Sequence, residues 1–124
     1  MFRVIIAGTR TFNNYTLLSS YADKLLAAKR AAGECIVIVS GHCTGADLLG
    51  EKYAVERGYM VEVYEAQWQL YGRAAGPMRN REMAEVSDAL IAFWDGVSRG
   101  TKNMIDEARA CGLAVRVKNY KAEG

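Results

Sequence analysis

Short apolar segments alternate with longer amphipathic segments along the whole of this chain. The apolar segments have the length of β-strands and are rich in valine, isoleucine and aromatic residues. They are Val4–Ala7, Ile36–Val39, Met60–Tyr64, Ala89–Phe93 and Ala114–Val117. Apolar residues at helical spacing mark the segments between them, which are Tyr15–Ala32, Ala46–Arg57, Pro77–Val86 and Thr101–Cys111. This alternation indicates βαβ units, and therefore a mostly parallel sheet with helices on both faces.

The connections between the segments limit how the strands can be ordered. Right-handed crossovers in a doubly wound sheet predict the strand order 3-2-1-4-5. The length of 124 residues suits one domain with a sizeable core. Ligands of such sheets bind beyond the carboxyl ends of the strands, where the strand order changes direction. We therefore expect the functional residues in the turns that follow the strands, above all the first and the fourth.

Composition excludes several classes of protein. A hydrophobic content of 51% with 24% charged residues is typical of a soluble globular domain. A net charge of +2 is too small to argue for a nucleic-acid partner. The apolar run after Met1 is too short for a signal peptide or a membrane span. Cys35, Cys43, Cys111 and the lone His42 lack metal-ligand spacing, so we expect reduced thiols, no metal, no cofactor and a cytoplasmic protein.

The turn after the first strand contains Gly8, Thr9 and Arg10. Glycine permits close approach to the backbone, threonine offers a hydroxyl group, and arginine offers a planar cation. The turn matches neither the GxGxxG fingerprint of dinucleotide-binding dehydrogenases nor the GxxxxGK[ST] phosphate loop. These residues could bind an anion, or they could form a simple tight turn between strand and helix.

The turn after the second strand is rich in small polar residues. Ser40, Gly41, Thr44 and Gly45 stand before a helix, where glycines and hydroxyl groups can cradle an anion. Asp47 follows in the first helical turn. It could contact a ribose, although capping of the helix is the more frequent use of such an aspartate.

The turn after the fourth strand offers a second candidate for anion binding. Asp95 and Gly96 are followed by Ser98, Gly100 and Thr101, again at the start of a helix. An ordinary capped loop would have the same composition. Because the first and fourth strands should be neighbours, we expect this turn and the first one to face the same crevice.

The remaining candidates precede the fourth strand. Pro77 is suited to start a helix, which would place Arg79 and Asn80 in the first helical turn. A cation there opposes the helix dipole, and a bound anion would remove that conflict; a solvated surface arginine is the alternative. The long irregular segment Glu65–Gly76 contains Trp68, which could stack on a base, cover a site or contribute to an oligomer interface.

These motifs resemble those of the SLOG superfamily, and most closely its YspA-type branch of unknown function. The matching residues are Gly8-Thr9-Arg10, Ser40-Gly41, Gly45-Ala46-Asp47, Trp68, Gly72-Arg73, Gly76–Met83 and Asp95–Thr101. The resemblance implies one Rossmann-like, three-layer α/β domain over residues 1–124. It also implies a nucleotide-derived ligand and, from the habit of the superfamily, a homo-oligomer.

The superfamily includes the LOG phosphoribohydrolases, and the comparison with them fails in part. Arg79 fits the arginine that these enzymes carry in the helix before the fourth strand. Their GTxxE motif supplies a glutamate that takes part in cleaving the N-glycosidic bond, and Met104 stands at its position here. A thioether cannot perform acid–base chemistry. Asp47, Glu82 or Asp95 would have to substitute for that glutamate.

Three functions follow from these observations. The leading prediction is the binding or sensing of a nucleotide-derived small molecule, with its phosphate held by backbone N–H groups, Arg10 and Arg79. The second is a LOG-like hydrolase acting on nucleoside monophosphates. The third is a DNA-processing accessory like DprA/Smf, another branch of the superfamily, which the low net charge disfavours.

Overall fold

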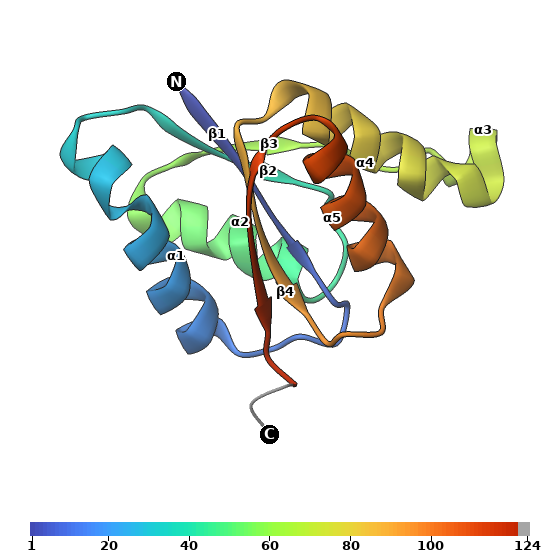
Figure 1. The fold of residues 1–124 in the computed structure, drawn as a ribbon, viewed down its shortest axis with the longest axis horizontal. Coiled ribbons are helices and arrows are strands. Elements are labelled where there is room, and N and C mark those ends of the chain that lie inside the picture. The colour runs from blue at the N-terminus through green and yellow to red at the C-terminus, as the bar shows by residue number, and fades with distance from the viewer. Residues whose placement is uncertain (122–124) are drawn as a thin grey trace.

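A parallel sheet of five strands forms the centre of the computed structural model, which describes residues 1–121 (Figure 1). The strands are β1 (Phe2–Gly8), β2 (Ile36–Ser40), β3 (Met60–Val63), β4 (Ala89–Trp94) and β5 (Ala114–Asn119). Their order is β3-β2-β1-β4-β5, and every neighbouring pair is parallel. The α/β class, the parallel sheet and the strand order predicted from the sequence are confirmed.

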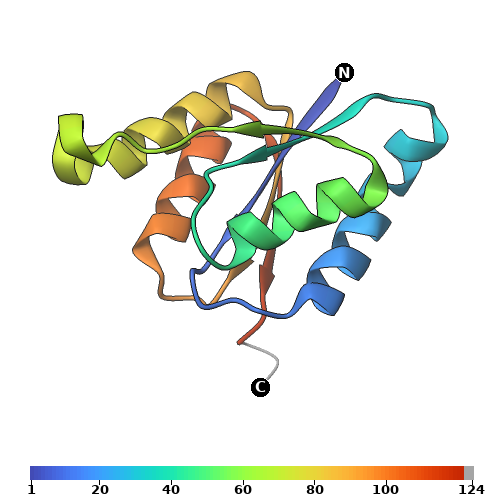
Figure 2. The ribbon, with the colours of Figure 1, turned by 180° about the vertical axis from the view of Figure 1, so that it is seen from behind.

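Helices cover both faces of the sheet. On one face lie α1 (Tyr15–Ala31) and α2 (Ala46–Arg57), and on the other lie α4 (Ala75–Val86) and α5 (Arg99–Ala110), as Figures 1 and 2 show. Between β3 and α4 the chain forms the short helix α3 (Trp68–Tyr71) and a 3-10 turn (Gly72–Ala74). Figure 2 shows α3 extending beyond the end of α4, away from the sheet.

The segment before α4 differs from the prediction in two respects. The residues predicted to be irregular contain α3 and the 3-10 turn, because a four-residue helix is too short to show a hydrophobic period. The 3-10 turn runs directly into α4, so this helix begins at Ala75 and Pro77 is its third residue. The first four N–H groups of a helix lack helical partners, so proline is tolerated there too. Arg79 and Asn80 consequently lie in the second helical turn, and the prediction of the first turn was wrong.

Alternate residues of the central strand contribute to two cores. Val4 and Ile6 belong to the core under α1 and α2, whereas Ile5 and Ala7 belong to the core under α4 and α5. All four side chains are buried. Because β1 and β4 are neighbours whose following helices lie on opposite faces, the strand order changes direction between them. A crevice is expected beyond the carboxyl ends of these two strands.

In the part of the chain that the structure describes, none of the helices has the length and apolar character needed to cross a membrane.

Candidate functional site

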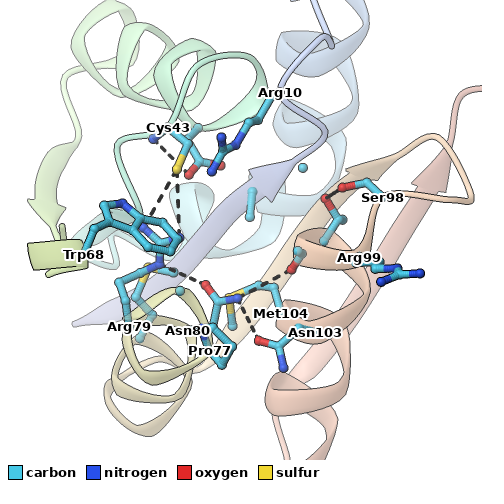
Figure 3. A pocket seen from close by; sticks show the side chains of 17 residues that line it. Arg10, Cys43, Trp68, Pro77, Arg79, Asn80, Ser98, Arg99, Asn103 and Met104 are labelled. Atoms are coloured by element: carbon cyan, nitrogen blue, oxygen red, sulfur yellow. Dashed lines mark hydrogen bonds between the residues drawn. The ribbon is translucent and has the colours of Figure 1, made fainter. Parts of the chain in front are cut away.

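A cavity of about 400 Å³ lies beyond the carboxyl end of β1, between α4 and α5. Its position agrees with the general rule for ligand sites in doubly wound sheets. The wall is formed by Ala7, Gly8, Arg10, Cys43, Asp47, Trp68, Gly76, Pro77, Arg79, Asn80, Met83, Ser98, Arg99, Gly100, Thr101, Asn103 and Met104 (Figure 3). The cavity therefore draws on loops and helices that are far apart in the sequence.

The structure brings part of the predicted set of site residues to this wall. Those that line the cavity are Gly8, Arg10, Asp47, Arg79, Asn80, Ser98, Gly100 and Thr101. Those that lie outside the wall are Thr9, Ser40, Gly41, Thr44, Gly45, Asp95 and Gly96. The first and third predicted turns thus converge with α4, whereas the second turn contributes Asp47 alone among its predicted residues.

Arg79 is a buried cation with one incompletely satisfied nitrogen. Its side chain is 9% exposed. Nε donates to Oδ1 of Asn80 (2.9 Å), and Nη1 donates to the carbonyls of Gly41 (2.7 Å) and Tyr64 (3.4 Å). Among the described residues, Nη2 has no oxygen acceptor, and its contact is the Cys43 sulfur at 3.9 Å. The protein's own carbonyls offset the charge, so the anion inferred from the helix dipole is not needed for that purpose.

Asn80 connects α4 to α5 at the side of the cavity. Its Oδ1 accepts from Arg79, so its amide nitrogen faces the other way and donates to Oδ1 of Asn103 (2.9 Å). A longer contact of 3.5 Å joins the same nitrogen to the carbonyl of Gly100. Arginine can only donate, which fixes the orientation of the Asn80 amide. This residue therefore positions both Arg79 and the first turns of α5.

Among the described residues that line the cavity, Asp47 is the only one with a carboxyl group. It is 6% exposed and accepts from the backbone N–H of Cys43 (3.2 Å) and from that of Gly8. Burial raises the pKa of Asp47 to about 6, although the Cys43 N–H, the Arg79 guanidinium and the Gly8 N–H oppose this shift. The group is therefore ionised at neutral pH and becomes neutral in mildly acidic solution.

The first turn of α5 forms part of the cavity wall. Ser98 occupies the N-cap position, but its side chain makes no capping bond to the helix. Its hydroxyl instead accepts from Oγ1 of Thr101 (3.3 Å). Ser98, Gly100 and Thr101 all line the cavity. An uncapped helix N-terminus carries a partial positive charge and favours an anion nearby.

Two further side chains frame the open side of the cavity. Arg10 is exposed and has no hydrogen bond or ion pair within residues 1–121. Trp68 comes from α3 with 49% of its surface exposed. Figure 3 shows both near Cys43, whereas the guanidinium of Arg99 lies on the side of α5 that faces away from Asn80. Arg10 is thus an exposed cation of the wall without a described partner, and Arg79 is a buried one.

The turn after β2 contributes Cys43 to the cavity wall, but the glycines and hydroxyl groups that suggested an anion cradle there lie outside the wall. Gly45 packs against the loop after β1: a Cβ on it would lie 2.4 Å from the carbonyl oxygens of Thr9 and Arg10. The Ala46 N–H at the start of α2 donates weakly to the Thr9 carbonyl (3.4 Å). Ser40 is completely buried. Protein carbonyls therefore occupy the place where a phosphate was expected.

Two glycines are required by contacts within the chain. A Cβ on Gly8 would lie 2.2 Å from the carbonyl oxygen of Phe93. A Cβ on Gly41 would lie 2.7 Å from Nη1 of Arg79 and 2.9 Å from Oδ2 of Asp47. Neither glycine has a positive φ angle, so close packing and not backbone conformation requires them.

Thr9, Asp95 and Gly96 shape the loop that leads into α5. The Asp95 N–H donates to Oγ1 of Thr9 (3.2 Å), which ties together the loops after β1 and β4. Oδ1 of Asp95 accepts from the N–H groups of Val97 (2.9 Å) and Ser98 (2.8 Å), and these bonds hold the pKa of Asp95 below its usual value. Gly96 adopts a φ of 88°. These residues position the N-terminus of α5.

The structure also decides which carboxyl group could replace the missing LOG glutamate. Met104 lines the cavity and is 2% exposed, so the wall at that position is apolar. Asp95 is bonded within its own loop, and Glu82 is exposed on α4 outside the wall. Of the three candidates, only Asp47 lies in the cavity wall that the structure describes.

Sequence reasoning left several wall residues out of the predicted site. They are Ala7, Cys43, Trp68, Gly76, Pro77, Met83, Arg99, Asn103 and Met104. Trp68 had a signal, since an aromatic residue in a long connection is a common functional feature. Met104 also had a signal, since it stands at the position of the glutamate in the LOG motif GTxxE, whereas nothing in the pattern separates Met83 from an ordinary core position. Residues 1–121 contain no cluster of three side chains suited to bind a metal ion.

Comparison with known proteins gives the family. A model of the YspA, cpYpsA-related SLOG family matches residues 2–71, more than half of the chain. The chain belongs to this family. The SLOG membership expected from the strand-end motifs is confirmed. The gene 61 protein of Mycobacterium phage D29 is 33% identical over 122 residues, which cover 93% of this SLOG chain and 94% of the phage protein. No solved structure gives a significant match.

Proposed function

We propose that this chain binds a nucleotide or a nucleotide-derived anion in the cavity beyond β1. The observation that carries the proposal is Nη2 of Arg79, which is held in the cavity wall with a sulfur atom at 3.9 Å and no described oxygen acceptor. The Cys43 sulfur is a weak acceptor, whereas a hydrogen bond from a charged donor to an oxygen contributes about 1.5–3 kcal/mol. A phosphate oxygen in the cavity would give Nη2 this stronger partner.

The other wall residues suit the same ligand class. Gly100 and Thr101 belong to an uncapped helix N-terminus, and Arg10 adds an unpaired cation at the mouth. The side chains of Met83 and Met104 give the wall an apolar part, which suits a base or a ribose. A volume of about 400 Å³ lies in the lower part of the range of about 300–1,000 Å³ found for small-molecule sites. SLOG membership supports a nucleotide-related ligand.

Thermal unfolding with AMP, ADP-ribose and NAD tests this proposal. A ligand present at about one hundred times its dissociation constant stabilises the folded state by about 2.7 kcal/mol. For a domain of this length, that corresponds to a rise in Tm of about 10 °C. Arg10→Ala should weaken binding about three- to tenfold, because a cation at the cavity mouth is lost. Arg73→Ala removes an exposed arginine outside the wall and serves as the matched control. The absence of any shift with all three compounds would refute the proposal.

One observation favours a second candidate, a hydrolase of nucleoside monophosphates. Asp47 lies in the cavity wall with its pKa raised to about 6, in the range required of a general acid or base near neutral pH. Incubation with AMP followed by chromatography would detect free adenine. Release that is abolished in Asp47→Asn would identify an enzyme. Binding of AMP without release of adenine would support the binding function and contradict the hydrolase.

A further inference from the structure

Trp68 lines the cavity and is half exposed, yet its side chain packs against α4. The residue is 49% exposed, and the short helix α3 that carries it contains no buried residue. Figures 1 and 2 show α3 beyond the end of α4, away from the sheet. A tryptophan on such a segment gains little from the core, yet its side chain forms part of the cavity wall.

Gly76 explains how the ring is held. This glycine is buried in the first turn of α4, where glycine costs about 1 kcal/mol relative to alanine. A Cβ on Gly76 would lie 3.1 Å from Cη2 of Trp68, and the next two atoms that it would meet also belong to that ring. The φ angle of Gly76 is not positive, so the backbone does not require glycine. The residue makes room for the indole against α4.

We propose that Trp68 is a preformed stacking surface for the base of the bound nucleotide, so that the site selects nucleotides over sugar phosphates. This inference rests on the proposed function, because Arg79 and the first turn of α5 are taken to hold the phosphate. Trp68 and Arg79 line the same cavity, one from α3 and the other from α4. A ring that is fixed before binding loses little freedom when a base stacks on it.

The size of the effect follows from known base–aromatic contacts. Replacing a stacking aromatic residue with alanine weakens binding about 5- to 150-fold per base. Such stacking tolerates every base, because each has a flat π face. A contact surface for another protein would also use the neighbouring Tyr71, which is 50% exposed on the same helix but lies outside the cavity wall. Tyr71 therefore provides a matched control.

Calorimetric titration with AMP and with ribose 5-phosphate tests the inference. The original chain should bind AMP at least about fivefold more tightly than ribose 5-phosphate. Trp68→Ala should weaken AMP binding by about that factor and leave ribose 5-phosphate unchanged. Trp68→Phe should retain most of the preference, and Tyr71→Ala should retain all of it.

The outcomes separate this inference from the function on which it rests. Trp68→Ala with equal losses for both compounds, or with no loss for either, would overturn the role of Trp68 while phosphate binding stands. Failure of both compounds to bind the original chain would overturn this inference, whereas the proposed function is overturned only if ADP-ribose and NAD also fail to bind. Dependence of AMP binding on Tyr71 as much as on Trp68 would also contradict a stacking role specific to Trp68.

Discussion

Replacing Arg79 with methionine should destabilise the protein as well as weaken ligand binding. Arg79→Met removes the short hydrogen bonds to the carbonyl of Gly41 (2.7 Å) and to Oδ1 of Asn80 (2.9 Å), together with the longer one to the carbonyl of Tyr64 (3.4 Å). The two backbone carbonyls follow β2 and β3, so this side chain links the ends of two strands to α4. Simple loss of a ligand contact would leave these links in place.

The magnitude can be estimated from the burial of these groups. Hydrogen bonds to a charged group contribute about 1.5–3 kcal/mol each, but removal of the guanidinium also relieves the cost of burying it. Methionine restores part of the lost apolar contact. We expect a net loss of about 2–4 kcal/mol in the free energy of unfolding. For 124 residues this is a fall in Tm of about 8–15 °C.

Urea denaturation of Arg79→Met and Arg10→Met provides the assay. Arg10 is exposed and makes no described hydrogen bond or ion pair, so its replacement should change the free energy of unfolding by less than about 0.5 kcal/mol. Both variants should bind AMP more weakly. If Arg79→Met were as stable as Arg10→Met, the linking role that we derive for the guanidinium would be wrong.

Other predictions concern the charge and packing of the wall. Protonation of Asp47 as the pH falls through about 6 removes negative charge, so ADP-ribose, whose own charge is constant there, should bind several-fold more tightly at pH 5 than at pH 7.5 by calorimetry; an equally steep dependence in Asp47→Asn would contradict this. Met104→Glu should weaken ADP-ribose binding about tenfold at pH 8, and unchanged affinity would place the ligand elsewhere. Gly8→Ala should cost more than about 3 kcal/mol in urea denaturation, because its Cβ would lie 2.2 Å from the Phe93 carbonyl. Gly100→Ala, with no atom within 4 Å of its Cβ, should be nearly neutral, and equal stability of the two variants would refute the packing argument.

The sheet could be predicted from the sequence because local pattern and chain connectivity determine it. Ile5 and Ile6 are adjacent and both buried, as expected of a central parallel strand covered on both faces. Right-handed crossovers then leave few orders for five such strands, and the structure has the expected one. The segment around Trp68 was missed as a helix because it has only four residues.

The site could be predicted only as far as strand order determines it. The ends of β1 and β4 had to be neighbours, so Gly8, Arg10 and Gly100 could be assigned to one crevice. The turn around Gly45 shows why the site could not be predicted further from the sequence. A glycine-rich turn before a helix has the same sequence pattern whether a phosphate or the protein's own carbonyls face it. Here the loop after β1 places the Thr9 carbonyl there, and only long-range folding reveals that.

The hydrogen bonds of Arg79 were hidden for a similar reason. Its partners Gly41 and Tyr64 lie in separate segments, and no local motif connects them to α4. The raised pKa of Asp47 likewise results from burial among several loops. Both residues could be identified as candidates from the sequence, whereas the hydrogen bonds of Arg79 and the raised pKa of Asp47 depend on the tertiary structure.

A crystal structure of the protein grown with AMP tests the central claim most directly. Our account predicts a phosphate oxygen about 3 Å from Nη2 of Arg79, with the phosphate also facing the N–H groups of Gly100 and Thr101. A phosphate bound outside this cavity, for example beside Thr44 at the start of α2, would contradict it.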